Sequence, residues 1–252
     1  MHLDFSGKTA IVTGGASGIG AAIAQALTSC GANVHVFDVR GNPSVDVSDS
    51  KAIEAAFART PAPDVVMVNA GIGSPAELTS TTDDVWQRTI AINLTGAFHT
   101  IRAAASRMMP RRRGAIVLTA STNSYDGEPL LTAYNASKAG LLGILHTAAA
   151  ELGPYGIRVN AVCPGLIRTP LTEAHFSNPE LLKEYFRQIP LGRGGEASEV
   201  AASAVFLASD LAGYVTGATL FVDGGQMASK FGTWNESMAK FSDGRWTLLK
   251  PA

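Results

Sequence analysis

Short apolar runs alternate with longer segments of helical periodicity along most of the chain. Runs rich in β-branched residues predict six strands, over 9–13, 33–39, 64–69, 115–119, 157–162 and 219–222. Apolar residues at helical spacing predict helices over 21–30, 83–109, 134–152 and 199–209. Strands that are apolar throughout and alternate with helices indicate a parallel sheet covered on both faces. We therefore expect an α/β fold with one doubly wound parallel sheet, in a single domain over residues 1–252.

The first departure from this regularity follows the second strand. Only seven residues (39–45) separate Asp38 from Asp46. A parallel crossover normally needs about a dozen residues or more and usually includes a helix. We therefore expect a shortened crossover after the second strand, without its helix, and a less covered sheet edge at this place.

The second departure is the tail that follows Asp223-Gly224-Gly225. The C-terminal extension over 228–252 is too aromatic for a disordered end, so we expect it to pack on its own subunit or on a neighbour. Its large aromatic residues are Phe231, Trp234, Phe241 and Trp246.

Composition argues against several classes of function. The 252 residues carry a formal net charge of -1, so no charge excess favours nucleic acid or a membrane surface. Cys30 and Cys163 are the only cysteines, and they form neither a disulfide framework nor a metal-ligand cluster. No apolar run is long enough for a bilayer, and the N-terminus does not resemble a signal peptide. We expect a cytoplasmic protein that acts on a small molecule without a metal.

A glycine-rich loop, TGGASGIG over 13–20, joins the first strand to the helix that follows. Its glycines permit a tight turn and a close approach of the backbone to a pyrophosphate, while the helix N-terminus supplies free N–H groups. An ordinary tight turn is the alternative, but the strand–loop–helix setting favours dinucleotide binding. The predicted contacts are Gly14, Ser17, Gly18, Ile19 and Gly20.

Asp38 ends the second predicted strand, 18 residues beyond Gly20. A carboxylate there can accept hydrogen bonds from both adenosine ribose hydroxyls and would repel a 2′-phosphate, so it selects NAD over NADP. Arg40 argues in the opposite direction, because an arginine could bind that phosphate. On balance we expect NAD as the cofactor.

Tyr134 and Lys138 lie four residues apart at the start of a predicted helix and therefore share a face. A tyrosine with a pKa near 10 is a poor base at neutral pH. A lysine cation ~4 Å away, at an effective dielectric of ~20, would favour the phenolate by about 4 kcal/mol. In isolation the pair would be an ordinary surface tyrosine and lysine; in this setting we expect Tyr134 to transfer a proton.

The motifs together resemble those of the short-chain dehydrogenases/reductases, of the classical single-domain type, over roughly residues 5–225. The resemblance implies a Rossmann-like fold, hydride transfer between a nicotinamide cofactor and an alcohol or ketone, and a homotetramer or dimer. It rests on the ordered set of the glycine loop, Asn69-Ala70-Gly71, Asn93, Ser121, Tyr134-Asn135-Ala136-Ser137-Lys138 and Pro164-Gly165.

The resemblance also implies roles for single residues. Ser121, which follows a strand at the sheet edge where ligands bind, would hold the substrate oxygen against Tyr134. Asn93 would kink its helix and hold a water that links Lys138 to solvent. Beside Tyr134 and Lys138, the remaining cofactor contacts would be Asp46, Val47, Asn69, Ala70, Gly71, Pro164, Gly165, Ile167 and Thr169, although Thr169 could equally cap a helix.

The segment 171–195 is expected to form a mobile substrate lid, with Glu173 and His175 as candidate contacts. Asn123, Glu128 and Arg168 suggest a hydroxylated substrate, such as a sugar, a polyol or a cyclic alcohol. A 3-oxoacyl thioester reductase is one alternative, although such enzymes usually use NADP. A non-enzymatic NAD-sensing or scaffold protein is another, but it would be free to lose the serine, tyrosine and lysine that this chain keeps.

Overall fold

A six-stranded parallel sheet forms the centre of the computed structural model, which describes residues 3–229 and 232–249. The strand order is β2-β1-β3-β4-β5-β8, so the chain leaves β1 in one direction and returns to its other side at β3. The strands are β1 (Thr9–Thr13), β2 (Asn33–Phe37), β3 (Val65–Val68), β4 (Gly114–Thr119), β5 (Ile157–Pro164) and β8 (Thr219–Val222). The reversal of strand order opens a crevice at the carboxyl ends, where such sheets bind ligands. The predicted doubly wound parallel sheet is confirmed.

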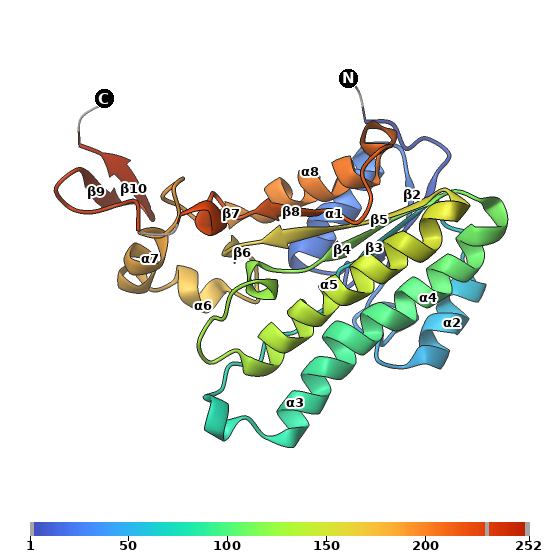
Figure 1. Cartoon of the computed structure of the whole chain (residues 1–252), viewed down its shortest axis with the longest axis horizontal. Coiled ribbons are helices and arrows are strands. Elements are labelled where there is room, and N and C mark those ends of the chain that lie inside the picture. The colour runs from blue at the N-terminus through green and yellow to red at the C-terminus, as the bar shows by residue number, and fades with distance from the viewer. Residues whose placement is uncertain (1–2, 230–231, 250–252) are drawn as a thin grey trace.

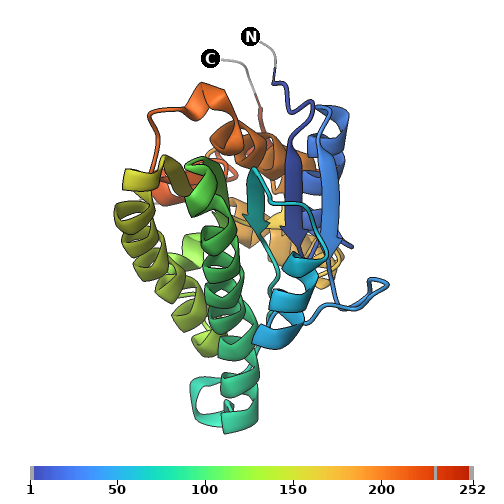
Figure 2. The same ribbon diagram turned by 90° about the vertical axis from the view of Figure 1, so that its right-hand side faces the viewer.

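Helices cover both faces of this sheet (Figures 1 and 2). Alternate residues of one strand face opposite layers: Ile116 and Leu118 of β4 join the core beneath α2, α4 and α5, whereas Ala115 and Val117 join the core beneath α1 and α8. The helices are α1 (Gly18–Ser29), α2 (Ser50–Ala58), α3 (Asp83–Ile90), α4 (Gly96–Met108), α5 (Thr132–Leu152), α6 (Glu173–Phe176), α7 (Pro179–Phe186) and α8 (Ala197–Ala208). Within the described ranges, no helix has the length and apolarity to cross a membrane.

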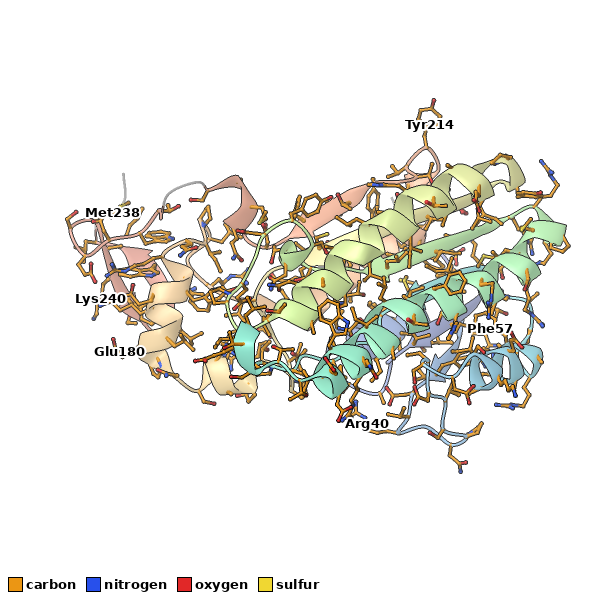
Figure 3. The ribbon with its side chains drawn as sticks, turned by 60° about the horizontal axis from the view of Figure 1, so that its bottom comes forward. Arg40, Phe57, Glu180, Tyr214, Met238 and Lys240 are labelled. Carbon is orange, nitrogen blue, oxygen red and sulfur yellow. The ribbon has the colours of Figure 1, made fainter. Side chains whose placement is uncertain are left out.

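The crossover between β2 and β3 contains a helix, so the prediction that this helix is missing is wrong. The side chain of Asp49 caps α2 by accepting a hydrogen bond from the Lys51 amide at 2.8 Å. Phe57 of α2 is buried and meets the Phe37 ring edge-on, with ring centroids 5.4 Å apart (Figure 3 labels Phe57). The short stretch that ends at Asp46 is only a loop; the chain re-enters the sheet at Val65, which leaves room for a helix.

The helix predicted over 83–109 is interrupted in the structure. A π-helical turn, Ala91–Thr95, lies between α3 and α4 and contains the buried Asn93. Such turns are rare and occur often at functional sites. The interruption therefore places an asparagine side chain, rather than a regular helix surface, against the carboxyl end of the sheet.

The tail packs on its own chain, beside the predicted lid. β9 (Ala239–Ser242) and β10 (Arg245–Leu248) form an antiparallel hairpin at the same end of the molecule as α7, as Figure 3 shows through Lys240 and Glu180. Trp246 is only 3% exposed, and its indole N–H donates to the Lys183 carbonyl of α7 at 3.1 Å. Phe231 lies outside the described residues.

The lid segment is closed at its base. β6 (Ile167–Arg168) pairs in parallel with β7 (Gly195–Glu196), so the two ends of the lid are joined and α6 and α7 lie between them. Leu182 and Phe186 of α7 are buried with Trp246 in a small core of their own. The lid and the tail therefore form one packed unit at the edge of the domain.

We predict that Trp246→Ala releases the hairpin from α7. Truncating a buried tryptophan typically costs about 3–5 kcal/mol. Each ~1.4 kcal/mol of lost stability raises the population of the opened hairpin tenfold. If the hairpin closes faster than trypsin cuts, the cleavage rate at Lys240 and Arg245 follows this population and should rise about 100-fold or more. Leu248→Ala is the matched control, because Leu248 is 43% exposed on the same strand. Equal cleavage of the two variants would contradict the packing described here.

Candidate active site

A cavity of about 710 Å³ lies at the carboxyl ends of β1, β3, β4 and β5. All the predicted catalytic and cofactor-binding residues line it except Gly20 and Asn93, which lie against lining residues. The lining set comprises Gly14, Ser17, Gly18, Ile19, Asp38, Asp46, Val47, Asn69, Ala70, Gly71, Ser121, Tyr134, Lys138, Pro164, Gly165, Ile167 and Thr169. Residues far apart in the sequence are thus brought to one elongated site.

The glycine loop leads from β1 into α1 along one side of this cavity. Gly14 has a φ of 65°, a conformation that favours glycine. A Cβ added at Gly20 would lie 2.2 Å from the carbonyl oxygen of Gly14, so the loop can close only over a bare glycine. The open backbone and the free amides at the start of α1 fit the pyrophosphate of a dinucleotide.

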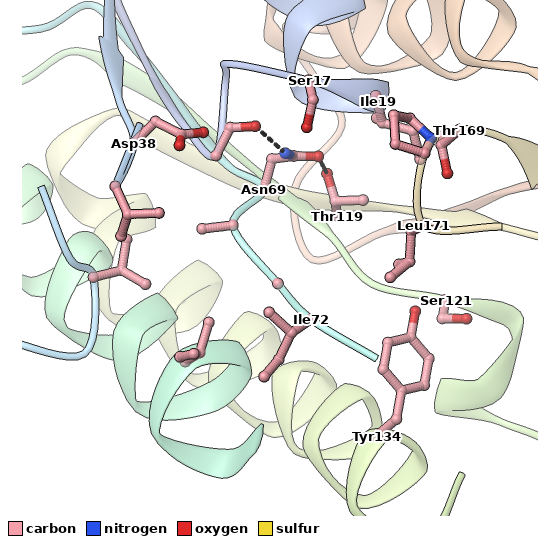
Figure 4. A pocket seen from close by; sticks show the side chains of 18 of the residues that line it. Ser17, Ile19, Asp38, Asn69, Ile72, Thr119, Ser121, Tyr134, Thr169 and Leu171 are labelled. Carbon is pink, nitrogen blue, oxygen red and sulfur yellow. Dashed lines mark hydrogen bonds between the residues drawn. The ribbon is translucent and has the colours of Figure 1, made fainter. Parts of the chain in front are cut away.

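Asn69 braces the loop from the adjacent strand. Its side-chain amide donates to the carbonyl oxygens of Thr13 and Gly14 at 3.2 and 3.3 Å. Its oxygen accepts the hydroxyl of Thr119 at 3.1 Å, which Figure 4 marks. The Asn69 amide N–H in turn donates to the Thr13 hydroxyl at 2.9 Å. Asn69 therefore ties together the ends of β1, β3 and β4.

Asp38 follows β2 and is only 6% exposed. Its carboxylate accepts hydrogen bonds from the amides of Ala16 at 3.0 Å and Arg40 at 2.9 Å. The Arg40 guanidinium lies 3.5 Å from the same carboxylate and also hydrogen-bonds the Ser17 hydroxyl. Burial alone would raise the pKa of Asp38, but the two amides and the guanidinium outweigh it and lower the pKa. A charged carboxylate and a cation thus sit side by side here.

Tyr134 lies in the first turn of α5 and Ser121 follows β4. Figure 4 shows the Tyr134 hydroxyl pointing toward the Ser121 side chain at one end of the cavity. Burial raises the pKa of Tyr134, a hydrogen bond with the Ser121 side chain opposes that rise, and the Glu128 carboxylate adds to it. The protein's own groups therefore keep this phenol protonated at neutral pH.

Lys138 is 4% exposed, and its ammonium donates to the Thr119 carbonyl at 2.7 Å. The ammonium lies 5.5 Å from the centroid of the Tyr134 ring, over its face. Burial lowers the pKa of Lys138 to about 8, so the side chain is still cationic at pH 7. The pKa of Tyr134 is raised by the protein's own groups, mainly through burial, so the expected lowering of this pKa by Lys138 stays a prediction.

Asn93, in the π-helical turn, forms hydrogen bonds with both the amide and the carbonyl of Ile72. Its oxygen accepts the Ile72 amide at 2.8 Å, and its nitrogen donates to the Ile72 carbonyl at 2.9 Å. The same nitrogen donates to the Ser137 hydroxyl at 3.0 Å, which donates to the Tyr134 carbonyl at 2.7 Å. The predicted water relay stays a prediction; the contacts assign Asn93 a role in fixing α5 against the segment after β3.

The residues suspected of contacting substrate divide into two groups. Asn123 donates to the Glu128 carboxylate at 3.2 Å and to the Asn135 side chain at 2.9 Å, and its amide donates to the Ser121 hydroxyl at 3.1 Å. Asn123 and Glu128 therefore belong to the Tyr134 end of the site. Arg168 instead stacks over Phe176 at 4.4 Å and pairs with Glu196 at 3.8 Å, and Glu173 is exposed. None of the five suspected residues is among those that line the cavity: Asn123, Glu128, Arg168, Glu173 and His175.

Two threonines that were not among the predicted site residues support the site; the sequence offers Thr119 only as a less favoured alternative to Ser121. Thr13 is fully buried, donates to the Met67 carbonyl at 3.3 Å and receives the Asn69 amide. Thr119 holds Asn69 with its hydroxyl and Lys138 with its carbonyl. Both end a parallel strand, and a polar residue that ends an otherwise apolar strand is the signal that could have identified them.

Comparison with known proteins agrees with this architecture. A family model described as enoyl-(acyl carrier protein) reductase matches residues 14–227. L-rhamnose 1-dehydrogenase (NAD(P)(+)) of Azotobacter vinelandii is 37% identical over 245 residues, covering 86% of this chain and 96% of the relative. Galactitol 2-dehydrogenase (L-tagatose-forming) of Cereibacter sphaeroides is 38% identical over 240 residues, covering 87% and 94%. The solved structure of a 3-oxoacyl-(acyl-carrier protein) reductase from Brucella melitensis has a TM-score of 0.83 and 36% identity, covering 89% of this chain and 92% of that chain.

We predict that Gly20→Ala weakens NADH binding at least about tenfold, equivalent to ~1.4 kcal/mol. The new Cβ would collide with the Gly14 carbonyl oxygen and displace the loop. Titration of tryptophan fluorescence with NADH measures the affinity. Gly143→Ala on α5 is the control, since among the described residues nothing outside its own stretch of helix lies within 4 Å of its added Cβ. Unchanged affinity in Gly20→Ala would show that the dinucleotide does not bind over this loop.

Proposed function

The chain belongs to the short-chain dehydrogenase/reductase family, of the classical type, and we propose that it transfers a hydride between NAD(H) and a secondary alcohol or ketone. The family members it resembles support the coarser statement that it is an oxidoreductase acting on CH–OH groups. The observation that carries the finer proposal is the meeting of Tyr134 and Ser121 at one end of the cavity, with Lys138 behind the tyrosine ring.

In the proposed mechanism Ser121 donates a hydrogen bond to the substrate oxygen and holds it against Tyr134. The Tyr134 oxygen takes the proton of the alcohol as the carbonyl forms, and it returns that proton in the reverse direction. Bound NAD(H) supplies the hydride acceptor or donor. The cation of Lys138 favours the phenolate form of Tyr134 and so opposes the rise in the pKa of Tyr134 that burial causes. Asn93 keeps the segment after β3 and the first turn of α5 in register.

NAD is the proposed cofactor, within the broader class of nicotinamide cofactors that the relatives use. Support comes from Asp38, whose ionised carboxylate faces the cavity at the end of β2 and would repel a 2′-phosphate. Arg40 is held by this carboxylate and by Ser17, so its charge is already partly neutralised. The relative from Azotobacter vinelandii is named for both NAD and NADP, which makes this carboxylate the feature to test.

A sugar, a polyol or a cyclic alcohol is the proposed substrate. Two relatives are named for dehydrogenation of rhamnose and galactitol, and the Asn123–Glu128 pair brings polar atoms beside Ser121. Reduction of a 3-oxoacyl thioester is the alternative, named for the Brucella structure; Asp38 argues against the NADP on which that reaction usually depends. A non-enzymatic NAD sensor is disfavoured because the whole Ser121–Tyr134–Lys138 set is retained.

We also propose a homotetramer. Large apolar side chains are exposed on α3 and α4, where Trp86 and Phe98 are 42% and 45% exposed, and on the edge strand β8, where Leu220 and Phe221 are each 37% exposed. Two such surfaces would serve the two kinds of contact that a tetramer needs. Sedimentation at the mass of a single chain would contradict this. A cytoplasmic location stays a prediction.

We expect Tyr134→Phe to lower kcat by about 10²–10⁴-fold, the usual contribution of a general base. Turnover is followed at 340 nm with NAD⁺ and a panel of sugars, polyols, cyclic alcohols, steroids and hydroxyacyl thioesters. NADH affinity should be unchanged. Tyr125→Phe is the control, because the Tyr125 hydroxyl bonds Thr219 at 2.7 Å and is not in the cavity lining. Full activity of Tyr134→Phe would refute its role in proton transfer.

Removal of the Asp38 charge should shift cofactor preference. In Asp38→Ala we expect the ratio of kcat/KM with NADP⁺ to that with NAD⁺ to rise at least about tenfold, or ~1.4 kcal/mol. The freed Arg40 would then be able to bind the 2′-phosphate. Asp49→Asn is the control, because Asp49 is exposed, is not in the cavity lining, and asparagine keeps the acceptor for the Lys51 amide. An unchanged ratio would show that another group sets the preference.

A further inference from the structure

A second set of polar groups lies near Tyr134, on the turn after β8. The Asp223 carboxylate accepts the amides of Gly225 at 2.9 Å and Met227 at 2.8 Å, which fixes the short 3-10 turn Gln226–Ala228. Gly225, with a φ of 90°, packs so closely on Pro190 that an added Cβ would lie 2.9 Å from that ring. The turn that carries Gln226 is therefore rigid and bound to the end of the lid.

The Gln226 side chain has an unusual environment. Its Oε1 is buried and has no hydrogen-bond partner among residues 3–229 and 232–249. It reaches Gly165 in the cavity wall, where an added Cβ would lie 3.1 Å from that oxygen. A buried acceptor without a donor costs free energy, so native proteins rarely leave one unless it has a functional partner. A donor supplied by a ligand would satisfy it.

Tyr185 projects from α7 toward the same place. Its pKa is raised to about 12, mainly by burial, with the charge of Glu128 and the nearby Tyr134 adding to the rise. A hydrogen bond with the Gln226 side chain opposes this. Because its pKa is raised, the Tyr185 O–H remains protonated and able to donate.

The third group is Glu128, which is held from the other side of the site. Asn123 donates to its carboxylate at 3.2 Å, and Asn135 donates to its backbone carbonyl at 2.9 Å. Asn123 also bonds Ser121, so Glu128 is coupled by two short links to the serine that would hold the substrate oxygen. A carboxylate accepts hydrogen bonds only, so it complements the donor of Tyr185.

The tail hairpin fixes the position of Tyr185. Trp246 donates to the Lys183 carbonyl at 3.1 Å, and Trp234 donates to the Ile189 carbonyl at 2.9 Å, so α7 is held both before and after Tyr185. The two indole rings stack with centroids 6.5 Å apart and an interplanar angle of 7°. The lid residue that faces Tyr134 is therefore held on a supported helix.

We propose that Tyr185, Gln226 and Glu128 form a recognition subsite for a hydroxyl group on the carbon next to the reacting carbinol. This inference rests on the proposed alcohol oxidation and specifies its substrate as a vicinal diol, as in a sugar or a polyol. The single O–H of that neighbouring hydroxyl donates to Gln226 Oε1 or to the Glu128 carboxylate, and Tyr185 donates to its oxygen. A site built in this way binds a substrate that lacks the hydroxyl poorly, because its buried polar groups are then left unpaired.

The test compares matched substrates that differ by one hydroxyl. With NAD⁺ at saturation, kcat/KM is measured at 340 nm for cis-1,2-cyclohexanediol against cyclohexanol, and for D-glucose against 2-deoxy-D-glucose. The wild type should prefer the diol member of the reacting pair by at least about tenfold. Tyr185→Phe and Gln226→Met should each remove most of that preference and leave the mono-alcohol rate nearly unchanged. Tyr125→Phe, with its hydroxyl on Thr219, should keep the preference.

The outcomes separate the subsite from the reaction. Thermal melting and NADH affinity that match the wild type establish that the variants are folded. A wild type without preference, or variants in which both members of a pair fall equally, would overturn the subsite while alcohol oxidation stands. A wild type that oxidises none of the four compounds and no other alcohol of the panel would overturn the proposed function, and the subsite with it.

Discussion

The hydrogen bonds of Asn69 hold together the feature on which the site depends, the crevice where the strand order reverses. β2 lies on one side of β1, and β3 and β4 lie on the other, so the connections that follow β1 and β3 run in opposite directions. This divergence opens the crevice and leaves polar backbone groups at the ends of the strands. One side chain satisfies the Thr13 and Gly14 carbonyls and the Thr119 hydroxyl. Because the Thr119 carbonyl also accepts a hydrogen bond from the Lys138 ammonium, the position of the glycine loop and that of Lys138 are linked through Asn69 and Thr119.

A second side chain, Asn93, joins the elements around Tyr134 by hydrogen bonds. The π-helical turn directs Asn93 at the backbone of Ile72 and at Ser137, so a local irregularity in one helix fixes the first turn of the next. The helix is interrupted at this turn, and the interruption fixes Tyr134, Lys138 and the segment after β3 relative to one another. Burial then raises the pKa of Tyr134 and lowers that of Lys138, which moves both groups toward their neutral forms.

The sequence allowed the sheet and most of the site to be predicted because their signals are local. Apolar runs of strand length, the glycine loop and the four-residue spacing of Tyr134 and Lys138 need no knowledge of distant contacts. The α2 helix was missed because the prediction counted the seven residues before Asp46 as the whole crossover, whereas the next strand begins only at Val65. The bracing threonines, and the meeting of Tyr185 with Gln226, depend on contacts across the domain, which spacing along the chain does not contain.

The order of the elements along the chain gives the tail hairpin a further meaning. The glycine loop, the sheet and the Tyr134 helix all precede it, so they leave the ribosome first and can assemble the dinucleotide crevice on their own. The indoles that hold α7 emerge only afterwards. During synthesis the nascent protein would pass through a stage in which the elements of the crevice have formed but the hairpin that holds α7 has not, so α7 would be the last helix to be fixed in place.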